Sequence, residues 1–381
     1  MMKVLICDPD YAPIAAFIRT SLLIKIRGWQ KNGAKITLIC SSEAKEFYRK
    51  MLPGIEIFTF PFKWESKTRW TVALEFLRAN FLMLPYIYKV NGKFDIIYSF
   101  SSTLEIVFFP FILTFIDRKV KWFAVVDNIV PKPVDRPGNI ILKTLPYLAF
   151  LIANIILKKA DGIFVVTKIL KDYYEKKGIK VIKTGSGNGL DLESLKGDIS
   201  PKTPKFNALF GGRIHPAKGI FDLVEIIKEI VKYNKDYTLG IMGDGEEYMK
   251  DKLKKEIKLN HFSKNIFLLG HKNTKERWDL YRNSDFFLFP SYAEGCPQVV
   301  LEAFAANKLV IAYDLPEYRD AFKKYIKCGE LVTFRKGNTA KIAKYILSIR
   351  GKRTHFHNKL SDFSWETIVN NEWKAFSQEV K

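Results

Sequence analysis

Short apolar runs alternate with longer segments of helical periodicity along the chain, and this alternation restricts the fold more than any other feature of the sequence. The apolar runs are typical of strands buried on both faces of a parallel sheet. Segments such as Thr68–Val90 and Ile140–Ala160 have the length and period of the helices that connect such strands. The sequence therefore predicts an α/β fold made of β-α-β units. The expected strands are Val4–Cys7, Ile36–Cys40, Ile55–Phe58, Phe94–Ser99, Trp122–Val126, Gly162–Thr167, Asn207–Phe210, Tyr237–Met242, Asn265–Leu269, Asp285–Phe289 and Leu309–Ala312.

The alternation stops in a stretch rich in glycine and proline, Thr184–Pro204, and then starts again. Linkers between domains concentrate these residues, and 381 residues suit two domains of ordinary size. We expect an N-terminal Rossmann-like domain over residues 1–187, a linker over 188–204 and a second Rossmann-like domain over 205–363. Ligands of doubly wound sheets bind outside the carboxyl ends of the strands, which predicts a site in a cleft between the two domains.

The chain carries a formal net charge of +22 at pH 7. Such an excess of cations favours polyanionic partners, which are nucleic acid, an anionic membrane surface or phosphorylated substrates. Lysines scattered over solvated surfaces would give the same charge, and composition leaves both interpretations open. No nucleic-acid-binding motif is recognisable, so we expect no nucleic acid among the partners.

The cysteines and the N-terminus both favour a cytoplasmic protein. The four cysteines are scattered without a C-x-x-C pair, which predicts a reducing compartment, no disulfide framework and no metal site. The run Val4–Cys7 is too short for the apolar region of a signal peptide and is interpreted as a strand. No uninterrupted apolar stretch reaches the length of about 18 residues that a spanning helix needs.

A glycine-containing segment, Phe210–Gly219, lies where an expected strand gives way to a helix. Gly211 and Gly212 would let the backbone approach a ligand closely because they have no side chain. Arg213 and Lys218 could converge on a diphosphate, the first as a planar fork and the second as a point charge. The alternative is an ordinary β-α turn with two solvated cations.

A second segment, Pro290–Ala303, follows an expected strand and opens a helix whose early positions include Pro297. The free N–H groups at the start of such a helix form a site for a phosphate. Glu294 lies in the loop before the helix and Glu302 about two turns later, roughly 8–12 Å further along. This spacing suits two carboxylates that contact different parts of one extended ligand rather than a paired acid and base. For either residue alone, an acid near a helix start or a surface glutamate would be the ordinary interpretation.

Together these segments resemble the family 4 retaining glycosyltransferases of the GT-B fold. The shared pattern is E-x7-E after a Pro-Ser-x-x-Glu-Gly turn, preceded by G-G-R-x-x-x-x-K-G. The resemblance is specific over residues 188–380 and only topological over residues 1–187. Four further elements resemble the family's interdomain connection, its G-x-G turn, its base-binding loop and its terminal element. They are Asn188–Asp191, Gly243–Gly245, Phe267–His271 and Ser364–Trp365.

The resemblance implies two Rossmann-like domains facing each other across a cleft, with residues 364–381 forming a C-terminal helix that crosses back to the first domain. It also implies a metal-independent enzyme without a cofactor. This enzyme would move a hexose from a UDP- or GDP-sugar to a glycan or lipid-linked acceptor and retain the anomeric configuration.

Carried over by position, Arg213 and Lys218 hold the donor diphosphate, Glu302 binds the ribose hydroxyls and Glu294 binds the sugar hydroxyls. A departing nucleoside diphosphate gains negative charge, which preorganised cations and helix N–H groups can stabilise. The resemblance implies further donor-binding residues, some of which act through their backbone. They are Gly212, Gly243, His271, Gly295, Cys296, Pro297 and Val299.

The first domain departs from the family pattern. Family members have a His-Asp-type dipeptide at the end of a first-domain strand, and none of the five histidines of this chain lies in that domain. Asp127, after the strand Trp122–Val126, is our candidate for the catalytic group that faces the anomeric carbon; an aspartate that caps the next turn is the alternative. The family's glycine-rich first loop is replaced by the bulkier segment Asp8–Ala16, which would narrow the phosphate pocket or alter acceptor binding. Its Asp8 and Asp10 resemble a metal-binding D-x-D, which we interpret as a structural turn.

Several first-domain segments are both apolar and aromatic. They are Phe81–Tyr88, Val107–Ile116 and Ile140–Leu157, and the last is followed by Lys158 and Lys159. Such segments next to basic residues suit a surface that docks on anionic lipid, which makes peripheral association with the inner face of a membrane a hypothesis. Ordinary buried helices of an α/β domain would have a similar composition.

Other functions use related architectures. A phosphorylase would be longer and would carry a pyridoxal lysine site. A sugar-nucleotide epimerase would be expected to use carboxylates and histidines from both domains, and the first domain has no histidine. A catalytically impaired glycosyltransferase-like protein would only bind the sugar nucleotide. The joint presence of Arg213, Lys218, Glu294 and Glu302 argues against loss of donor binding.

Overall fold

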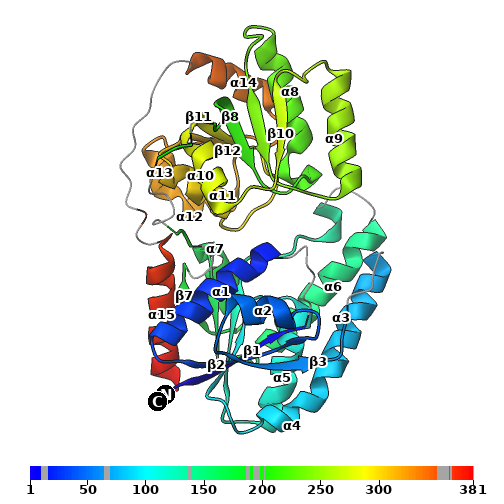
Figure 1. Cartoon of the computed structure of the whole chain (residues 1–381), viewed down its shortest axis with the longest axis vertical. Coiled ribbons are helices and arrows are strands. Elements are labelled where there is room, and N and C mark those ends of the chain that lie inside the picture. Colours follow the sequence, from blue (N-terminus) through cyan, green and yellow to red (C-terminus); the bar gives the residue numbers. More distant parts are fainter. Residues whose placement is uncertain are drawn as a thin grey trace. The chain divides into compact units, whose positions relative to one another are not determined.

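The computed structural model describes residues 1–9, 16–63, 69–135, 140–185, 189–191, 198–200, 202–349, 360 and 363–380. The chain divides into two compact units, which we describe separately (Figure 1). Unit 1 comprises Met1–Gly189 and Trp365–Lys381, and unit 2 comprises Leu190–Ser364. Asp10, and with it most of the segment predicted to replace the glycine-rich loop, lies outside the described residues.

Unit 1 is built on a seven-stranded sheet in the order β3-β2-β1-β4-β5-β6-β7, and every paired neighbour is parallel. The connections run outward in both directions from β1 and β4, so the switch point of this doubly wound sheet lies between these two strands. The strands are β1 Lys3–Asp8, β2 Lys35–Ser41, β3 Glu56–Phe60, β4 Ile96–Ser99, β5 Lys121–Val126, β6 Gly162–Val165 and β7 Val181–Thr184.

The helices of unit 1 cover both faces of its sheet. Right-handed crossovers place the helices after β1 and β2 on one face and those after β3, β4, β5 and β6 on the other. The last helix of the chain joins the first group, because it contacts α1 and contributes Val369 and Phe376 to the core cluster. The helices are α1 Ala16–Lys31, α2 Lys45–Met51, α3 Arg69–Met83, α4 Ile87–Val90, α5 Leu104–Ile116, α6 Ile140–Leu157, α7 Lys168–Glu175 and α15 Trp365–Glu379.

The predicted helix over Thr68–Val90 is not continuous. The α-helix α3 ends at Met83, a turn of 3₁₀-helix follows over Leu84–Tyr86, and α4 then begins at Ile87. Pro85 explains the break, because its ring clashes with the preceding turn and its nitrogen has no hydrogen to donate. Among the described residues, no helix has both the length and the apolar character needed to cross a bilayer.

Unit 2 contains a six-stranded parallel sheet in the order β10-β9-β8-β11-β12-β13. Its switch point lies between β8 and β11. The strands are β8 Phe206–Gly211, β9 Leu239–Met242, β10 Ile266–Gly270, β11 Ser284–Phe289, β12 Val310–Tyr313 and β13 Leu331–Phe334. The helices are α8 Ile220–Val231, α9 Glu247–Leu259, α10 Thr274–Arg282, α11 Gln298–Ala305, α12 Pro316–Ala321, α13 Lys323–Lys327 and α14 Thr339–Ser348.

The two segments that connect the units run side by side. Within unit 2, Leu190 pairs with Ser364 in a parallel bridge, and the Leu190 N–H donates to the Phe363 carbonyl at 2.7 Å. Within unit 1, a Cβ built on Gly189 would lie 2.6 Å from the Trp365 ring. The motif residues at 189–190 and 364–365 therefore pack against each other.

Candidate functional site

Loops after β8, β9 and β10 meet at the carboxyl edge of the unit 2 sheet. The Gly212 N–H donates to the Met242 carbonyl at 2.9 Å, and the Gly243 N–H donates to the Gly270 carbonyl at 2.9 Å. His271 follows directly and is exposed. The structure thus brings Gly212, Gly243 and the loop of His271 together, although 59 positions separate the first from the last (271 minus 212).

Two glycines in these loops have no room for a side chain. Gly243 has a φ of 136°, and a Cβ there would lie 1.9 Å from the Gly212 carbonyl oxygen. Gly219 has a φ of 71°, and a Cβ there would lie 2.0 Å from the Pro290 carbonyl oxygen. Both backbones adopt a conformation that favours glycine, so these residues allow neighbouring loops to touch at the main chain.

Lys218 and Glu294 form an ion pair at this edge of the sheet. The Lys218 Nζ contacts Glu294 Oε1, and the Ser291 hydroxyl donates to the same oxygen at 2.6 Å. The two charged side chains are 18% and 9% exposed. The Tyr292 N–H donates to the Ala217 carbonyl at 2.9 Å and so ties the loop after β11 to the turn after β8. Partial burial strengthens such a pair because the surroundings screen charge less than water does.

Asp222, in the first turn of α8, anchors the loop that carries Glu294. Tyr292 donates its hydroxyl to Asp222 Oδ2 at 2.6 Å, and the Tyr313 hydroxyl donates to the same oxygen. Burial and the hydrogen bond to Asp222 raise the pKa of Tyr292 to about 12 and also raise the pKa of Tyr313. Both hydroxyls are therefore donors at neutral pH. Sequence reasoning missed this anchor because its members lie on three separate elements.

Glu302, in the second turn of α11, is buried, with 2% of its side chain exposed. Its Oε1 accepts from Gln298 at 3.3 Å and lies 3.2 Å from the Arg277 guanidinium. Its other oxygen, Oε2, has no hydrogen-bond partner in the described part of the chain. Burial raises the pKa of this carboxyl, and the charge of Arg277 and the hydrogen bond from Gln298 oppose the rise. The surface-glutamate alternative is therefore wrong for Glu302.

Arg277 is a further residue that the sequence did not reveal. It lies on α10, which starts with a capping box between Asn273 and Glu276. Nothing in the local sequence distinguishes Arg277 from a solvated helix cation, since its role depends on a carboxylate 25 positions away (302 minus 277). Buried carboxylate oxygens without a partner are uncommon in native proteins, and Glu302 Oε2 is one of several such atoms among the described residues.

The helix α11 begins at Gln298, and Pro297 is its N-cap residue with extended backbone angles. Pro297 therefore precedes the first turn rather than lying in it. Gly295 is partly exposed and Cys296 is buried. The first N–H groups of a helix, here including that of Val299, have no carbonyl partner within the helix and attract anions.

Arg213 lies at the exposed rim of the same edge. In the part of the chain that the structure describes, its guanidinium makes no ion pair or hydrogen bond. A solvated cation can bind a negatively charged ligand without first breaking an interaction with another protein group.

Asp127 follows β5 at the carboxyl edge of the unit 1 sheet. Its side chain makes no hydrogen bond within the described residues, so the structure does not support the turn-capping alternative. The side chain keeps an exposed surface, yet it lies deep enough among protein atoms that desolvation raises its pKa. The positive charge of Lys25 opposes this rise. Asp8, the described part of the predicted turn, is buried and accepts a hydrogen bond from the Tyr48 hydroxyl.

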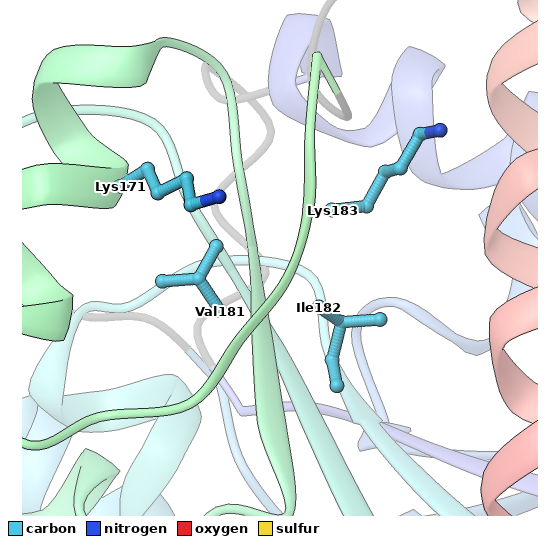
Figure 2. Close-up of a pocket in the computed structure, with 4 residues that line it drawn as sticks. All are labelled: Lys171, Val181, Ile182 and Lys183. Atoms are coloured by element: carbon cyan, nitrogen blue, oxygen red, sulfur yellow. The ribbon is translucent and has the colours of Figure 1, made fainter.

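A cavity of about 270 Å³ lies elsewhere in unit 1, between α7 and β7 (Figure 2). Lys171, Val181, Ile182 and Lys183 line it. None of the residues predicted from the sequence to form a site is among them.

Comparison with known proteins supports the sequence resemblance. Residues 193–361 match the family model of the glycosyl transferases group 1. An uncharacterized glycosyltransferase of Methanocaldococcus jannaschii is 32% identical over 155 residues, which are 40% of this chain and 40% of that protein. Mannosylglucosylglycerate synthase of Thermotoga maritima is 32% identical over 167 residues, which are 37% of this chain and 38% of that protein. The chain thus matches about two fifths of the length of these relatives.

Solved structures match over nearly the whole chain. HepE of Anabaena, crystallised in complex with UDP and glucose, superimposes with a TM-score of 0.66 at 17% identity, covering 99% of this chain and 95% of that protein. At this identity the likeness concerns the fold, and it confirms the predicted GT-B fold of two parallel-sheet α/β units. Residues 193–361 thus match the group 1 glycosyl transferases, and the whole chain has the GT-B fold.

Proposed function

We propose that this chain is a retaining glycosyltransferase, of the family 4 type, that transfers a hexose from a UDP- or GDP-sugar to a glycan or lipid-linked acceptor. The observation that carries the proposal is the placement of Lys218, Glu294 and Glu302 at one edge of the unit 2 sheet. A cation, a carboxylate paired with it and a buried carboxylate with one free oxygen suit a ligand that combines phosphates with hydroxyl groups.

Lys218, Arg213 and the start of α11 would bind the donor diphosphate. Lys218 is held in place by Glu294 and by its position beside the Phe289 ring, 5.9 Å from the ring centroid. When the bond between sugar and phosphate breaks, the leaving diphosphate gains negative charge. Fixed cations and N–H groups stabilise this charge without reorganising, and the loss of one such group costs on the order of 10²–10³ in turnover.

The two glutamates would orient the donor. Glu302 Oε2, which has no partner among the described residues, would accept hydrogen bonds from the ribose hydroxyls. Glu294 would bind hydroxyls of the sugar while Lys218 balances its charge. The backbone around Gly243 and His271 would line the base, and that of Gly295–Pro297 the sugar. This division of labour is the one that the family resemblance implies, and both carboxylates are largely buried.

Asp127 would act on the acceptor side of the reaction. Its lack of a hydrogen-bond partner in the described part of unit 1 leaves it free to position an acceptor hydroxyl or, when ionised, to stabilise oxocarbenium charge. We propose that it serves where the family pattern has a histidine-containing dipeptide.

The donor can be identified by incubating the protein with UDP-glucose, UDP-galactose or GDP-mannose and candidate acceptors. UDP-glucose is the first choice because HepE, which shares the fold, was also crystallised in complex with UDP-glucose. Released nucleoside diphosphate reports transfer, and proton NMR of the product reports the anomeric configuration. An α-linked product from an α-configured donor supports retention, and a β-linked product refutes it. Donor binding without transfer to any acceptor would instead favour the catalytically impaired alternative.

A further inference from the structure

One layer of unit 1 is apolar on the side that faces away from the sheet. α6 packs inward through buried residues that include Ala153 and Leu157. On its other side Leu148, Ile152 and Ile155 are exposed, at intervals of four and three residues that place them on one helical stripe. A helix that is apolar on all sides is normally covered on all sides, so the outer stripe of α6 is a surface that lacks a partner among the described residues.

The neighbouring helices extend the same surface. On α3, Leu74, Leu77 and Phe81 are exposed at intervals of three and four residues. At the end of α5, Phe115 and Ile116 are exposed as well. α3 packs on α5 and α5 packs on α6, so the three helices form one layer (Figure 1). Contiguous apolar side chains on a protein surface indicate a site of interaction, whereas single exposed ones do not.

Cations gather at one end of this layer. The helices α3, α5 and α6 each connect parallel strands, so their C-terminal ends lie at the amino edge of the sheet. Exposed basic residues follow all three: Lys89 after α3, Arg118 and Lys119 after α5, and Lys158 and Lys159 after α6. Asp117, which lies between the end of α5 and Arg118, is buried and accepts a hydrogen bond from the Gly92 N–H at 2.7 Å.

We propose that the outer face of the α3–α5–α6 layer docks on an anionic lipid bilayer. Its exposed aliphatic and aromatic side chains would enter the boundary between head groups and acyl chains, and the five cations would lie near the lipid phosphates. Charge decides between this occupant and a second copy of the chain. Two copies, each with a net charge of +22, would bring like charges together, whereas an anionic bilayer has the opposite charge.

Flotation of the full chain with vesicles tests the proposal directly. At low ionic strength, the protein is expected to float with vesicles of phosphatidylglycerol and phosphatidylcholine and to bind vesicles of pure phosphatidylcholine much more weakly. High salt is expected to reduce binding to the anionic vesicles because it screens the attraction between the protein's cations and the lipid phosphates. The assay needs no glycosyl transfer, so its outcome is independent of the proposed donor and acceptor.

Two sets of exposed substitutions separate the apolar and ionic contributions. Ile152→Ser with Ile155→Ser is expected to lower the partition coefficient about tenfold or more, and Lys158→Gln with Lys159→Gln to lower it by a similar factor and to weaken its salt dependence. The matched controls lie on α9 in unit 2, where apolar and basic side chains are also exposed. Tyr248→Ser with Leu259→Ser, and Lys255→Gln with Lys258→Gln, are expected to bind as the wild type does.

Three results would overturn the proposal. The wild type could remain unbound to anionic vesicles. The Ile152/Ile155 variant could bind as well as the wild type, which would reduce the interaction to charge alone. Sedimentation could also show a dimer in lipid-free solution that the same variant dissociates, in which case a second copy occupies the face.

Discussion

Buried charged side chains in this chain pair with residues that are distant in the sequence. The Lys25 Nζ lies 2.7 Å from Glu372 Oε1 and donates to the Tyr98 hydroxyl at 2.9 Å. Lys25 is 3% exposed and Glu372 is fully buried, so both have lost their hydration and depend on each other. Because Lys25 also opposes the raised pKa of Asp127, this pair sets the charge environment of the candidate catalytic group.

Breaking the Lys25–Glu372 pair from one side should destabilise unit 1. Glu372→Gln leaves the buried Lys25 charge without its counter-ion, which costs about 3–5 kcal/mol. The double variant Lys25→Met with Glu372→Met removes both charges and should regain most of that loss. The midpoint of urea unfolding measures each effect. Equal destabilisation of the single and double variants would show that the pair does not act as a unit.

The pH dependence of nucleotide binding should reveal Glu302. Burial raises its pKa above the ordinary value of 4.5, so as the pH falls it takes up a proton earlier than an exposed glutamate would. The protonated group accepts hydrogen bonds from ribose hydroxyls more weakly. Affinity for UDP should therefore be complete above this pKa and should fall as the pH is lowered through it.

Calorimetric titration with UDP from about pH 8 to about pH 4.5 checks this prediction. The diphosphate of UDP also titrates in this pH range. Glu302→Gln is therefore the control, because binding to this variant still reflects the titration of the diphosphate but no longer that of a carboxyl group at position 302. The difference in UDP affinity between the wild type and Glu302→Gln should become smaller as the pH falls. Parallel curves over the whole range would exclude ionised Glu302 from the binding site.

At the scale of elements, much of the architecture could be predicted from apolar periodicity. The prediction omits β7 and β13, whose segments, Val181–Thr184 and Leu331–Phe334, are short and half-exposed at the sheet edges. Strands buried on both faces are continuous apolar runs, and β7 and β13 lack this signal, whereas the other two edge strands, β3 and β10, have apolar runs and are predicted. The predicted strand Gly162–Thr167 ends at Val165, because Thr167 instead caps α7 by accepting the Leu170 N–H.

Gly189 offers a test of the paired connections between the units. A methyl group at this position would lie 2.6 Å from the buried Trp365 ring, so Gly189→Ala should lower the thermal midpoint at a cost of about 1–3 kcal/mol. In a Trp365→Leu background, Gly189→Ala should cost much less, because the added methyl group then no longer clashes with the indole ring. If Gly189→Ala melts as the wild type does, the two segments do not pack as closely as described.

The residues that set the site chemistry were only partly predictable. Lys218 and Glu294 could be found because each belongs to a motif with fixed spacing. Arg277 could not, since a cation on a helix has no sequence signal until its partner is known. The orphaned oxygen of Glu302 is likewise a property of the packed fold, because burial and hydrogen-bond partners are set by elements far apart along the chain.

At the scale of the whole molecule, the two units should contribute separable steps. In the proposed function, donor binding depends on residues of unit 2, whereas Asp127 belongs to unit 1. Asp127→Asn should lower transfer on the order of 10²-fold or more while leaving the dissociation constant of the donor unchanged. Asn128→Asp with Asp127→Asn, which moves the carboxylate by one residue, is the matched control and should not restore activity. Full activity of Asp127→Asn would assign the acceptor chemistry to another residue.

The central claim is that the carboxyl edge of the unit 2 sheet binds a nucleotide sugar through Lys218 and Glu302. The most direct measurement is calorimetric titration of the wild type, Lys218→Ala and Glu302→Ala with UDP- and GDP-sugars, with Lys235→Ala, an exposed lysine before β9, as the control. One nucleotide class is expected to bind the wild type and Lys235→Ala equally, and each site variant is expected to lose about tenfold or more in affinity for it. Failure of every nucleotide sugar to bind the wild type, or undiminished binding by both site variants, would contradict it.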